Sequence, residues 1–471
     1  MHGRGKSRTI LIARGFPKEG DGMNFRTIAR YGVRSVPGEE KEIVAAFRRG
    51  EAVEGPAISE FEERFAAYHY MDHAIAASYG RMAFYYILRA LNLPSGSEII
   101  FPALTFWVVP EIARQAGFKP VFVDVDPFTF NLEPKQIATA ITEHTRVIVP
   151  THLYGQPCAM KEILRIAEKH NLIVVEDCAQ AAGARYHGRL VGTFGTAAFF
   201  SFQMLKGVNT YGGGMALTNN PELAARVREI ATAEPLPSTN DVAVRLLKGY
   251  AARIGISPKV FTFWGYPIQA LASMFSDVDL SKYMWEKIRP LDFFPRTYTQ
   301  RYSNAQAVIG IRGLAKLDEY NGRSREHALR YASGLSDCRS VQTPTTHPGV
   351  EHVYYQYCIY TSDPGRTSRR AIRRGVDLET MHVDVCSGLP LFKAFAAVCP
   401  GAEETRAALQ LPVYSRLRSS DVDRVLHVMH EVTCDLAPFV ETDSEVLRRT
   451  AAAGSKVYNN HSSEYTCHSN F

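Results

Sequence analysis

Short apolar segments alternate with amphipathic ones along residues 74–217, and this alternation limits the possible folds more than any other feature of the sequence. The apolar segments have the length of strands, whereas the segments between them repeat apolar side chains at helical spacing. Strands that alternate with helices form a mostly parallel sheet covered by helices on both faces. The predicted strands are 98–101, 120–125, 146–150, 172–176, 197–201 and 214–217, and the predicted helices are 81–91, 108–116, 133–141 and 160–170.

The chain of 471 residues is long enough for a large domain and a smaller one. We predict a large domain over residues 23–325 and a small C-terminal α/β domain over residues 326–440. The two ends, residues 1–22 and 441–471, lack apolar periodicity and are expected to be mobile or disordered. Towards the C-terminus we predict one long helix over 304–335, a strand over 354–361, and helices over 367–374 and 420–432.

Composition and charge exclude several functional classes. The net charge of +6 is modest for this length and no basic stripe stands out, which argues against nucleic-acid binding. The eight cysteines are scattered without a C-x-x-C pair, so neither a disulfide framework nor a metal site is predicted, and reduced thiols suit a cytoplasmic protein. We see no signal peptide, and the longest uncharged stretch, 260–276, is too short to span a membrane.

An acid and an amine follow two of the predicted strands. Asp177 ends the nearly continuous apolar strand 172–176, and Lys206 follows the strand 197–201 and precedes a glycine run at 212–214. Ligands of parallel sheets gather at the carboxyl ends of the strands. Pyridoxal phosphate (PLP) needs this pair, because its aldehyde forms a Schiff base with a lysine and a carboxylate pairs with its pyridinium nitrogen. Taken singly, Asp177 could be a turn cap and Lys206 a solvated loop lysine.

Other residues near these strand ends could contact the same cofactor. Gly80 precedes a predicted helix, whose free N–H groups and positive dipole end favour an anion such as phosphate. Ser201 could donate to the phosphate, Gln180 could donate to the phenolic oxygen of the ring, and Phe106 could stack on the ring. Each of these residues also has an ordinary structural interpretation: a local backbone bond, a surface amide and a core aromatic.

In combination, the motifs resemble the sugar aminotransferases named for DegT, DnrJ, EryC1 and StrS, over about residues 55–432 except for an insertion. The matching segments are Gly-Pro-Ala-Ile-Ser-Glu-Phe-Glu at 55–62, Phe-Pro-Ala-Leu-Thr-Phe at 101–106, Pro-Val-Phe-Val-Asp-Val at 120–125, His-Leu-Tyr-Gly-Gln-Pro at 152–157, Glu-Asp-Cys-Ala-Gln at 176–180, Ser-Phe-Gln-Met-Leu-Lys at 201–206, Gln-Ala-Val-Ile-Gly at 306–310 and Leu-Pro-Val-Tyr at 411–414. The resemblance implies the fold of PLP-dependent transferases of fold type I, and a homodimer with its active sites at the subunit interface.

The resemblance also implies roles for individual residues. Lys206 would hold PLP as an internal aldimine and shuttle the proton, and Asp177 would keep the pyridine nitrogen protonated. Gln180 would touch the phenolic oxygen, and Phe106 would lie at the ring-stacking position. The phosphate site would consist of Gly80, Arg81, Met82 and Ser201. His382 and Arg301 would bind substrate.

The sequence departs from the family pattern at several of these positions. Arg81 stands where the family usually has Thr, and Thr299 stands where an Asn from the partner subunit normally reaches the phosphate. The family's Gly-Glu-Gly-Gly reads Tyr-Gly-Gly-Gly at 211–214, and its His-Tyr reads His-Val at 382–383. We hypothesise that the Arg81 guanidinium supplies the phosphate charge balance that the missing Asn leaves weaker; the alternative is a solvent-facing arginine.

Residues 234–296 interrupt the strand–helix rhythm and are predicted to be an insertion. Its first half is cationic and helical, and its second half is aromatic and uncharged. The preferred interpretation is that it extends the dimer interface or covers the active site, because aromatic residues are common in buried interfaces. The alternative is contact of residues 240–280 with a membrane surface, as amphipathic anchors make.

The sequence therefore predicts an enzyme, a PLP-dependent aminotransferase that moves an amino group from glutamate or glutamine to a keto-sugar, expected to be nucleotide-linked, for amino-sugar, polysaccharide or secondary-metabolite synthesis. One alternative is a PLP-dependent sugar dehydratase, but relatives of that type replace the lysine with histidine. Another is a PLP-binding regulator or membrane-associated scaffold without transaminase activity, which would have no need for Asp177, Gln180, Ser201 and Lys206 together.

Overall fold

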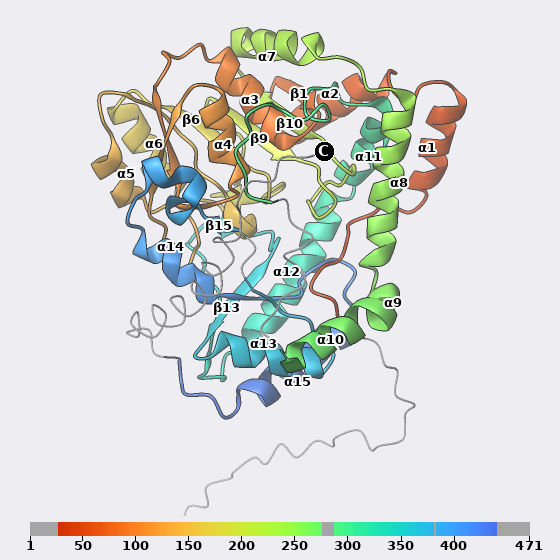
Figure 1. The fold of residues 1–471 in the computed structure, drawn as a ribbon, viewed down its shortest axis with the longest axis vertical. Helices are drawn as coiled ribbons and strands as arrows, with labels where there is room; N and C mark the ends of the chain where they lie inside the picture. Colours follow the sequence, from red (N-terminus) through yellow and green to blue (C-terminus); the bar gives the residue numbers. More distant parts are fainter. Residues whose placement is uncertain (1–26, 276–286, 381–382, 440–471) are drawn as a thin grey trace, which may run out of the picture.

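The computed structural model describes residues 27–275, 287–380 and 383–439. The predicted end segments 1–22 and 441–471 lie outside the described residues. The described part of the chain has a large α/β body around a seven-stranded sheet and a smaller body around a four-stranded sheet, with helix α12 (Leu317–Gly334) running from one to the other (Figure 1). The predicted boundary between residues 325 and 326 falls inside α12.

The large sheet is mostly parallel, as the alternating pattern predicts. Its strand order is β1 (His73–Ala77), β10 (Gly214–Thr218), β9 (Ala197–Ser201), β6 (Ile173–Asp177), β5 (Thr145–Ile148), β2 (Glu98–Pro102) and β4 (Lys119–Val123). β10 pairs antiparallel with both of its neighbours, and the other pairs are parallel. β1 was missed by the sequence analysis; its segment is rich in alanine, which gives a weak strand signal.

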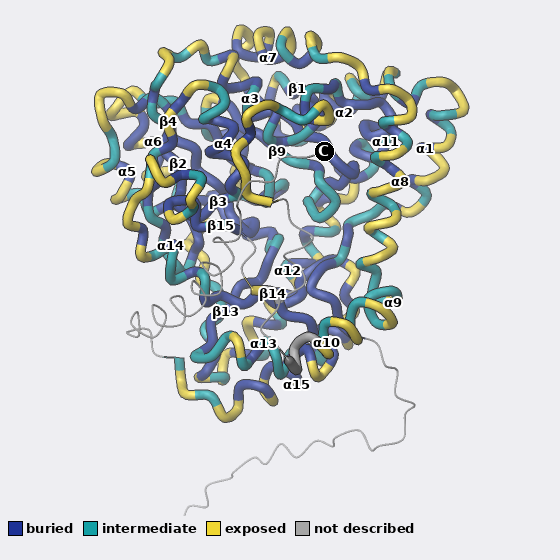
Figure 2. The backbone as a smooth tube through the Cα atoms, viewed as in Figure 1, coloured by how far each residue is buried: buried dark blue, intermediate teal, exposed yellow. Residues whose placement is uncertain are grey.

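Helices cover both faces of this sheet because successive residues of each strand point to opposite sides. Ala197 and Phe199 of β9 pack with α3 (Gly80–Ala90), α4 (Val108–Gln115) and α7 (Pro221–Ala233). Ala198 and Phe200 pack with α2 (Ala57–His69) and α11 (Asn304–Leu314) on the other face. That second face continues under α5 (Pro134–Ala140) and α6 (Met160–Lys169). The buried residues follow these layers (Figure 2).

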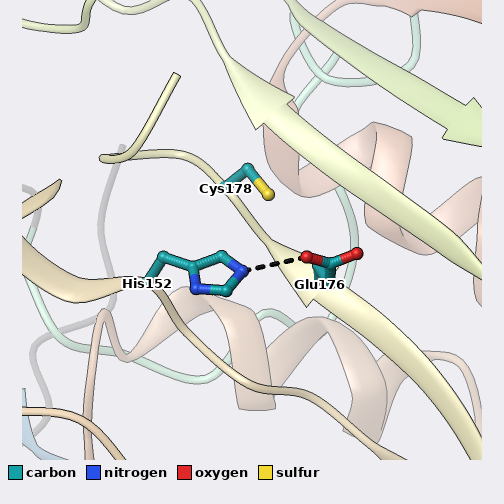
Figure 3. A group of neighbouring side chains, drawn as sticks. All are labelled: His152, Glu176 and Cys178. Atoms are coloured by element: carbon teal, nitrogen blue, oxygen red, sulfur yellow. Dashed lines mark hydrogen bonds and ion pairs between the residues drawn. The ribbon is translucent and has the colours of Figure 1, made fainter. Parts of the chain in front are cut away.

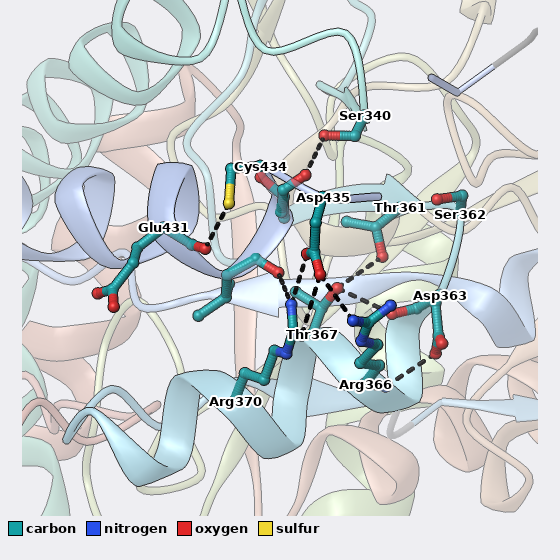
Figure 4. Close-up of polar contacts among 12 residues, drawn as sticks. Ser340, Thr361, Ser362, Asp363, Arg366, Thr367, Arg370, Glu431, Cys434 and Asp435 are labelled. Carbon is teal, nitrogen blue, oxygen red and sulfur yellow. Dashed lines mark hydrogen bonds and ion pairs between the residues drawn. The ribbon is translucent and has the colours of Figure 1, made fainter. Parts of the chain in front are cut away.

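The smaller body has the strand order β11 (Val341–Gln342), β13 (Tyr357–Thr361), β16 (Leu409–Leu411) and β14 (Glu379–Thr380). Its helices are α13 (Pro364–Arg373) and α15 (Ser419–Thr433), whereas α14 (Pro400–Glu404) is bonded to Asp124 of the large body. Arg366 and Arg370 of α13 both bind the carboxylate of Asp435 just after α15, with N–O distances of 2.6–3.1 Å, and so join the ends of these two helices (Figure 4).

Shorter strands complete the fold. β7 (Arg185–Tyr186), β8 (Arg189–Leu190) and β12 (Val350–Glu351) form a small sheet, and β3 (Leu104–Thr105) pairs with β15 (Asp384–Val385). Short segments of 3-10 helix occur at Leu153–Gly155, Cys386–Gly388, Pro390–Phe395 and Thr405–Ala407.

The predicted single helix over 304–335 is wrong. The structure has two helices, α11 and α12, separated at Ala315 and Lys316. Ala315 N–H bonds to the Ile311 carbonyl and Lys316 N–H bonds to Gly313, so the last turn of α11 tightens before α12 begins. The break lets α11 lie against the large sheet while α12 extends to the smaller body.

The segment predicted as an insertion contains α8 (Thr239–Gly255), α9 (Pro258–Val260), a π turn at Phe261–Gly265 and α10 (Tyr266–Phe275). Ser238 and Asp241 form a capping box that begins α8. Arg253 of α8 binds Glu39, the first residue of α1 (Glu39–Arg48), while α10 packs against α13 of the smaller body. The described part of its second half therefore lies on the smaller body, and the interpretation that the insertion extends the dimer interface or covers the active site stays a prediction.

Candidate active site

Asp177 occupies the carboxyl end of β6, next to β9 at the centre of the large sheet. Its side chain is buried, and the Ala179 N–H donates to Oδ1 at 3.0 Å. Burial raises the pKa of Asp177 to about 6, while that bond and the Lys206 ammonium oppose the rise. Among the described residues this is the only hydrogen bond to the carboxylate, so Asp177 remains able to pair with a cationic or N–H-bearing group.

Lys206 lies in the loop after β9, where its N–H bonds to the Gln203 carbonyl. Burial lowers the pKa of Lys206 to about 8, the Asp177 carboxylate counteracts this, and the nearby Arg81 charge lowers the pKa further. Its Nζ lies 4.7 Å from the centroid of the Tyr355 ring. The structure thus brings the acid and the amine to one end of the sheet, and an amine with this pKa is a competent nucleophile near neutral pH.

The N-terminus of α3 meets the end of β9 at Gly80. A Cβ atom on Gly80 would lie 2.7 Å from the Phe200 carbonyl oxygen and 2.9 Å from the Ser201 Cβ, so only glycine permits this approach. Within the described residues no side chain caps this helix, whose first residues are Gly80, Arg81 and Met82. An uncapped helix N-terminus beside a serine is suited to an anion.

Arg81 is surrounded by aromatic side chains. Its guanidinium carbon lies 4.9 Å from the ring centroid of Tyr298 and 5.6 Å from those of Tyr79 and Phe106. It also donates to the Tyr298 hydroxyl. The side chain is thus half-buried among these rings and does not extend freely into solvent, while its role in phosphate binding stays a prediction. Phe106 is half-buried beside this guanidinium.

Gln180 follows Asp177 and faces the same strand ends. Its Oε1 accepts the Tyr154 N–H at 2.9 Å, which leaves the amide NH₂ as the donor available to a ligand. Tyr154 itself adopts a left-handed backbone conformation with φ 55°. The Gln180 side chain is therefore oriented by the backbone of the neighbouring loop.

His152, Glu176 and Cys178 form a buried polar cluster (Figure 3), and two of its members are the neighbours of Asp177 in the chain. Glu176 accepts hydrogen bonds from three backbone N–H groups, those of Gly192, Phe194 and Gly195, at 2.7–2.8 Å, and from His152 Nε2 at 3.1 Å. His152 Nδ1 accepts the Cys158 N–H. His152, Glu176 and Cys178 have the composition of a metal site, but these bonds occupy the imidazole and the carboxylate. The cluster instead fixes the end of β6 and thus Asp177.

Of the two residues predicted to bind substrate, the structure describes Arg301 but not His382. His382 lies outside the described residues. Arg301 pairs with Glu54 at 3.6 Å, and its backbone N–H bonds to the Pro235 carbonyl. Thr299 is half-buried next to Tyr298.

Sequence reasoning missed Tyr298 and Tyr355. Tyr298 contacts Arg81, and its carbonyl accepts the Ser78 hydroxyl. Tyr355 lies under the Lys206 amine. Both residues are far from the recognised motifs in the sequence, so only the tertiary structure brings them to the site.

The profile of the DegT/DnrJ/EryC1/StrS aminotransferase family matches residues 36–255 and 267–430. The chain belongs to this family. Its members are PLP-dependent aminotransferases, and the chain is accordingly an aminotransferase with the fold of PLP-dependent transferases of fold type I. The interruption at 256–266 falls inside the predicted insertion 234–296.

Several relatives in the family resemble the chain over most of its length. A pleiotropic regulatory protein from Geobacillus stearothermophilus is 32% identical over 80% of the chain and 89% of its own length. The GDP-perosamine synthase of Caulobacter vibrioides is 30% identical over 80% of the chain and 90% of its own length. The solved structure of S. venezuelae DesV in complex with a ketimine intermediate is 28% identical, covers 85% of this chain and 95% of that chain, and superimposes with a TM-score of 0.68.

None of the helices in the part of the chain that the structure describes has the length and apolarity that a membrane crossing requires.

Proposed function

We propose that the protein binds PLP and transfers the amino group of glutamate or glutamine to the ketone of a nucleotide-linked sugar. The observation that carries this proposal is the pairing of Asp177 and Lys206 at adjacent strand ends, with an uncapped helix N-terminus beside them. The names of relatives support the substrate class, because they include a GDP-perosamine synthase and a dTDP-3-amino-3,4,6-trideoxy-alpha-D-glucose transaminase from Streptomyces venezuelae, 30% identical over 80% of this chain.

The residues present fit PLP. The buried Asp177 carboxylate has one backbone donor among the described residues and needs a cationic partner, which a pyridinium N–H supplies. Lys206 Nζ offers the attachment point, and Gly80, Arg81, Met82 and Ser201, where the start of α3 meets the end of β9, would hold the phosphate. When bound, PLP supplies an electron sink that makes the α-carbon of an attached amine acidic.

The side chains divide the remaining work. Lys206 Nζ, with a pKa of about 8, can take a proton from the α-carbon of the donor and return one to the acceptor carbon near neutral pH. With PLP bound, Asp177 would hold a negative charge against the ring nitrogen. Gln180 would donate to the phenolic oxygen, Phe106 would pack on the ring, and Tyr355, whose ring lies 4.7 Å from Lys206 Nζ, would shield the amine from water. In the net reaction the donor becomes a 2-oxo acid and the sugar ketone becomes an amine.

The test is covalent. The purified protein, incubated with PLP and reduced with borohydride, is expected to carry the label on the peptide that contains Lys206, and glutamate added before reduction should remove it. Lys206→Ala should abolish the label, whereas Lys248→Ala, at an exposed position, should keep it. A label on another amine, or a coloured protein inert to every amino donor, would contradict the proposal. A screen of nucleotide-linked keto-sugars against the glutamate-treated enzyme then identifies the acceptor.

Several points stay predictions: PLP as the cofactor, a cytoplasmic location and a homodimer. The domain boundaries 23–325 and 326–440 also stay predictions.

A further inference from the structure

The helix formed by α9, the π turn and α10 turns its polar residues towards the protein. The Thr262 hydroxyl lies 2.8 Å from that of Thr27, and Gln269 Nε2 donates to Asp377 Oδ1 at 3.0 Å. These two residues are seven apart and therefore lie on one side of a helix. This side meets the smaller body, where Asp377 is also held by Arg30.

The opposite side of the same helix is apolar and exposed. We call it the outer apolar face, and it consists of Phe263, Trp264, Pro267, Ile268 and Leu271. Phe263 is 76% exposed and Trp264 is 73% exposed, while Ile268 and Leu271 are 56% and 58% exposed. A surface helix ordinarily places its apolar residues inward and its polar residues outward, so the order here is reversed. A contiguous apolar surface of this kind marks a site of interaction.

Two exposed lysines lie in the same segment of the chain as the outer apolar face. Residues 242–276 contain four cationic residues, Arg245, Lys248, Arg253 and Lys259, and no Asp or Glu, but Arg253 is paired with Glu39 and Glu40. Lys248 and Lys259 are exposed, as are Leu247 and Ile254 on α8. α13, which packs against α10, is rich in arginine; three of its flanking arginines pair with Asp435 and Glu431.

We infer that the outer apolar face docks the protein on an anionic lipid bilayer. Interfacial anchors combine Trp, Phe and Leu, which enter the boundary between headgroups and acyl chains, with Lys and Arg that meet the anionic headgroups. A second copy of the chain suits the surface less well. In a two-fold contact the outer apolar faces of two copies would meet, and the lysines beside one face would lie against the lysines beside the other and repel them. In a free amphipathic anchor the polar face of the helix points into water. Here the polar face contacts the smaller body instead, and the apolar face is left to meet the membrane.

Vesicle flotation tests this inference with the full-length protein. The protein is expected to float with vesicles that contain phosphatidylglycerol. With vesicles of phosphatidylcholine alone it should stay at the bottom of the gradient. Added salt should weaken the binding to the anionic vesicles. A triple variant, Trp264→Ser with Ile268→Ser and Leu271→Ser, should reduce binding by at least about tenfold. Val398→Ser, which changes a side chain that is 95% exposed outside the outer apolar face, is the matched control and should bind like the parent protein.

A charge-reversal variant, Lys248→Glu with Lys259→Glu, should bind less even at low salt. Light scattering of the parent and the triple variant should give the same mass. Absence of binding to anionic vesicles would overturn the inference, and so would unchanged binding of the triple variant. A loss of self-association in the triple variant would assign the face to a second copy instead and would equally overturn it. None of these outcomes bears on the PLP label at Lys206.

Discussion

The guanidinium carbon of Arg81 lies 4.9 Å from the centroid of the Tyr298 ring, and the same guanidinium donates to the Tyr298 hydroxyl. This contact joins the first turn of α3 to the loop that precedes α11. It places a permanent positive charge at the helix N-terminus proposed to hold the phosphate, near enough to lower the pKa of Lys206.

Replacement of Arg81 by alanine should weaken PLP binding by roughly 10- to 100-fold, because charge-assisted hydrogen bonds contribute about 1.5–3 kcal/mol. The pKa of Lys206 should also rise, since a neighbouring positive charge is removed. Titration with PLP and the pH profile of Lys206 labelling measure the two effects. Arg89→Ala, on the exposed side of the same helix, should leave both unchanged. Unaltered PLP affinity in Arg81→Ala would refute the phosphate role.

Gly80→Ala should weaken PLP binding and lower the free energy of unfolding, because the new methyl group would lie 2.7 Å from the Phe200 carbonyl oxygen and must push α3 away from β9. We expect a loss of about 1–3 kcal/mol by denaturant unfolding. Gly322→Ala in α12 has open space around its Cβ position and should be neutral or stabilising by up to about 1 kcal/mol. Equal effects of the two substitutions would rule out this account of the helix end.

Asp177 should make the stability of the PLP-free protein depend on pH. Its pKa in the folded state, about 6, lies above the ordinary value of 3.8, because the buried carboxyl group resists ionisation. Its contribution to the free energy of unfolding is therefore fully present below about pH 4, where the group is protonated in both states, and is lost as the pH rises through 6. The loss is on the order of 3 kcal/mol, from a shift of about two pKa units. Asp177→Asn should remove this pH dependence while abolishing most transaminase activity. Thermal unfolding of both proteins between pH 4 and 8 measures it, and parallel curves would contradict the prediction.

Glu176→Gln should lower the free energy of unfolding by about 3 kcal/mol. The carboxylate accepts hydrogen bonds from three backbone N–H groups, and in the variant an amide NH₂ group, itself a donor, would face some of these N–H groups. PLP affinity should fall as well, since Glu176 fixes the strand end that carries Asp177. Glu168→Gln, at an exposed position on α6, is the control and should stay within about 0.5 kcal/mol of the parent protein. Zinc should stabilise neither protein; stabilisation of the parent by zinc would show that the His152 cluster binds metal after all.

The sequence by itself determined most of the large sheet, though not β1, and the two residues on which the proposed site depends. Apolar segments of strand length, alternating with helices, predict β2, β4, β5, β6 and β9 and their parallel arrangement. The carboxyl ends of parallel strands lie at one edge of the sheet. Asp177 and Lys206, which follow two of these strands, could therefore be paired from the sequence alone. The fold family followed from the same motifs.

Only the tertiary structure decided the surroundings of that pair. Tyr298 and Tyr355 reach Arg81 and Lys206 from segments about 217 and 149 residues further along the chain, and no local pattern encodes such contacts. The break between α11 and α12 and the outward apolar face of α10 also depend on packing, because periodicity gives the apolar side of a helix but not which side the rest of the protein covers.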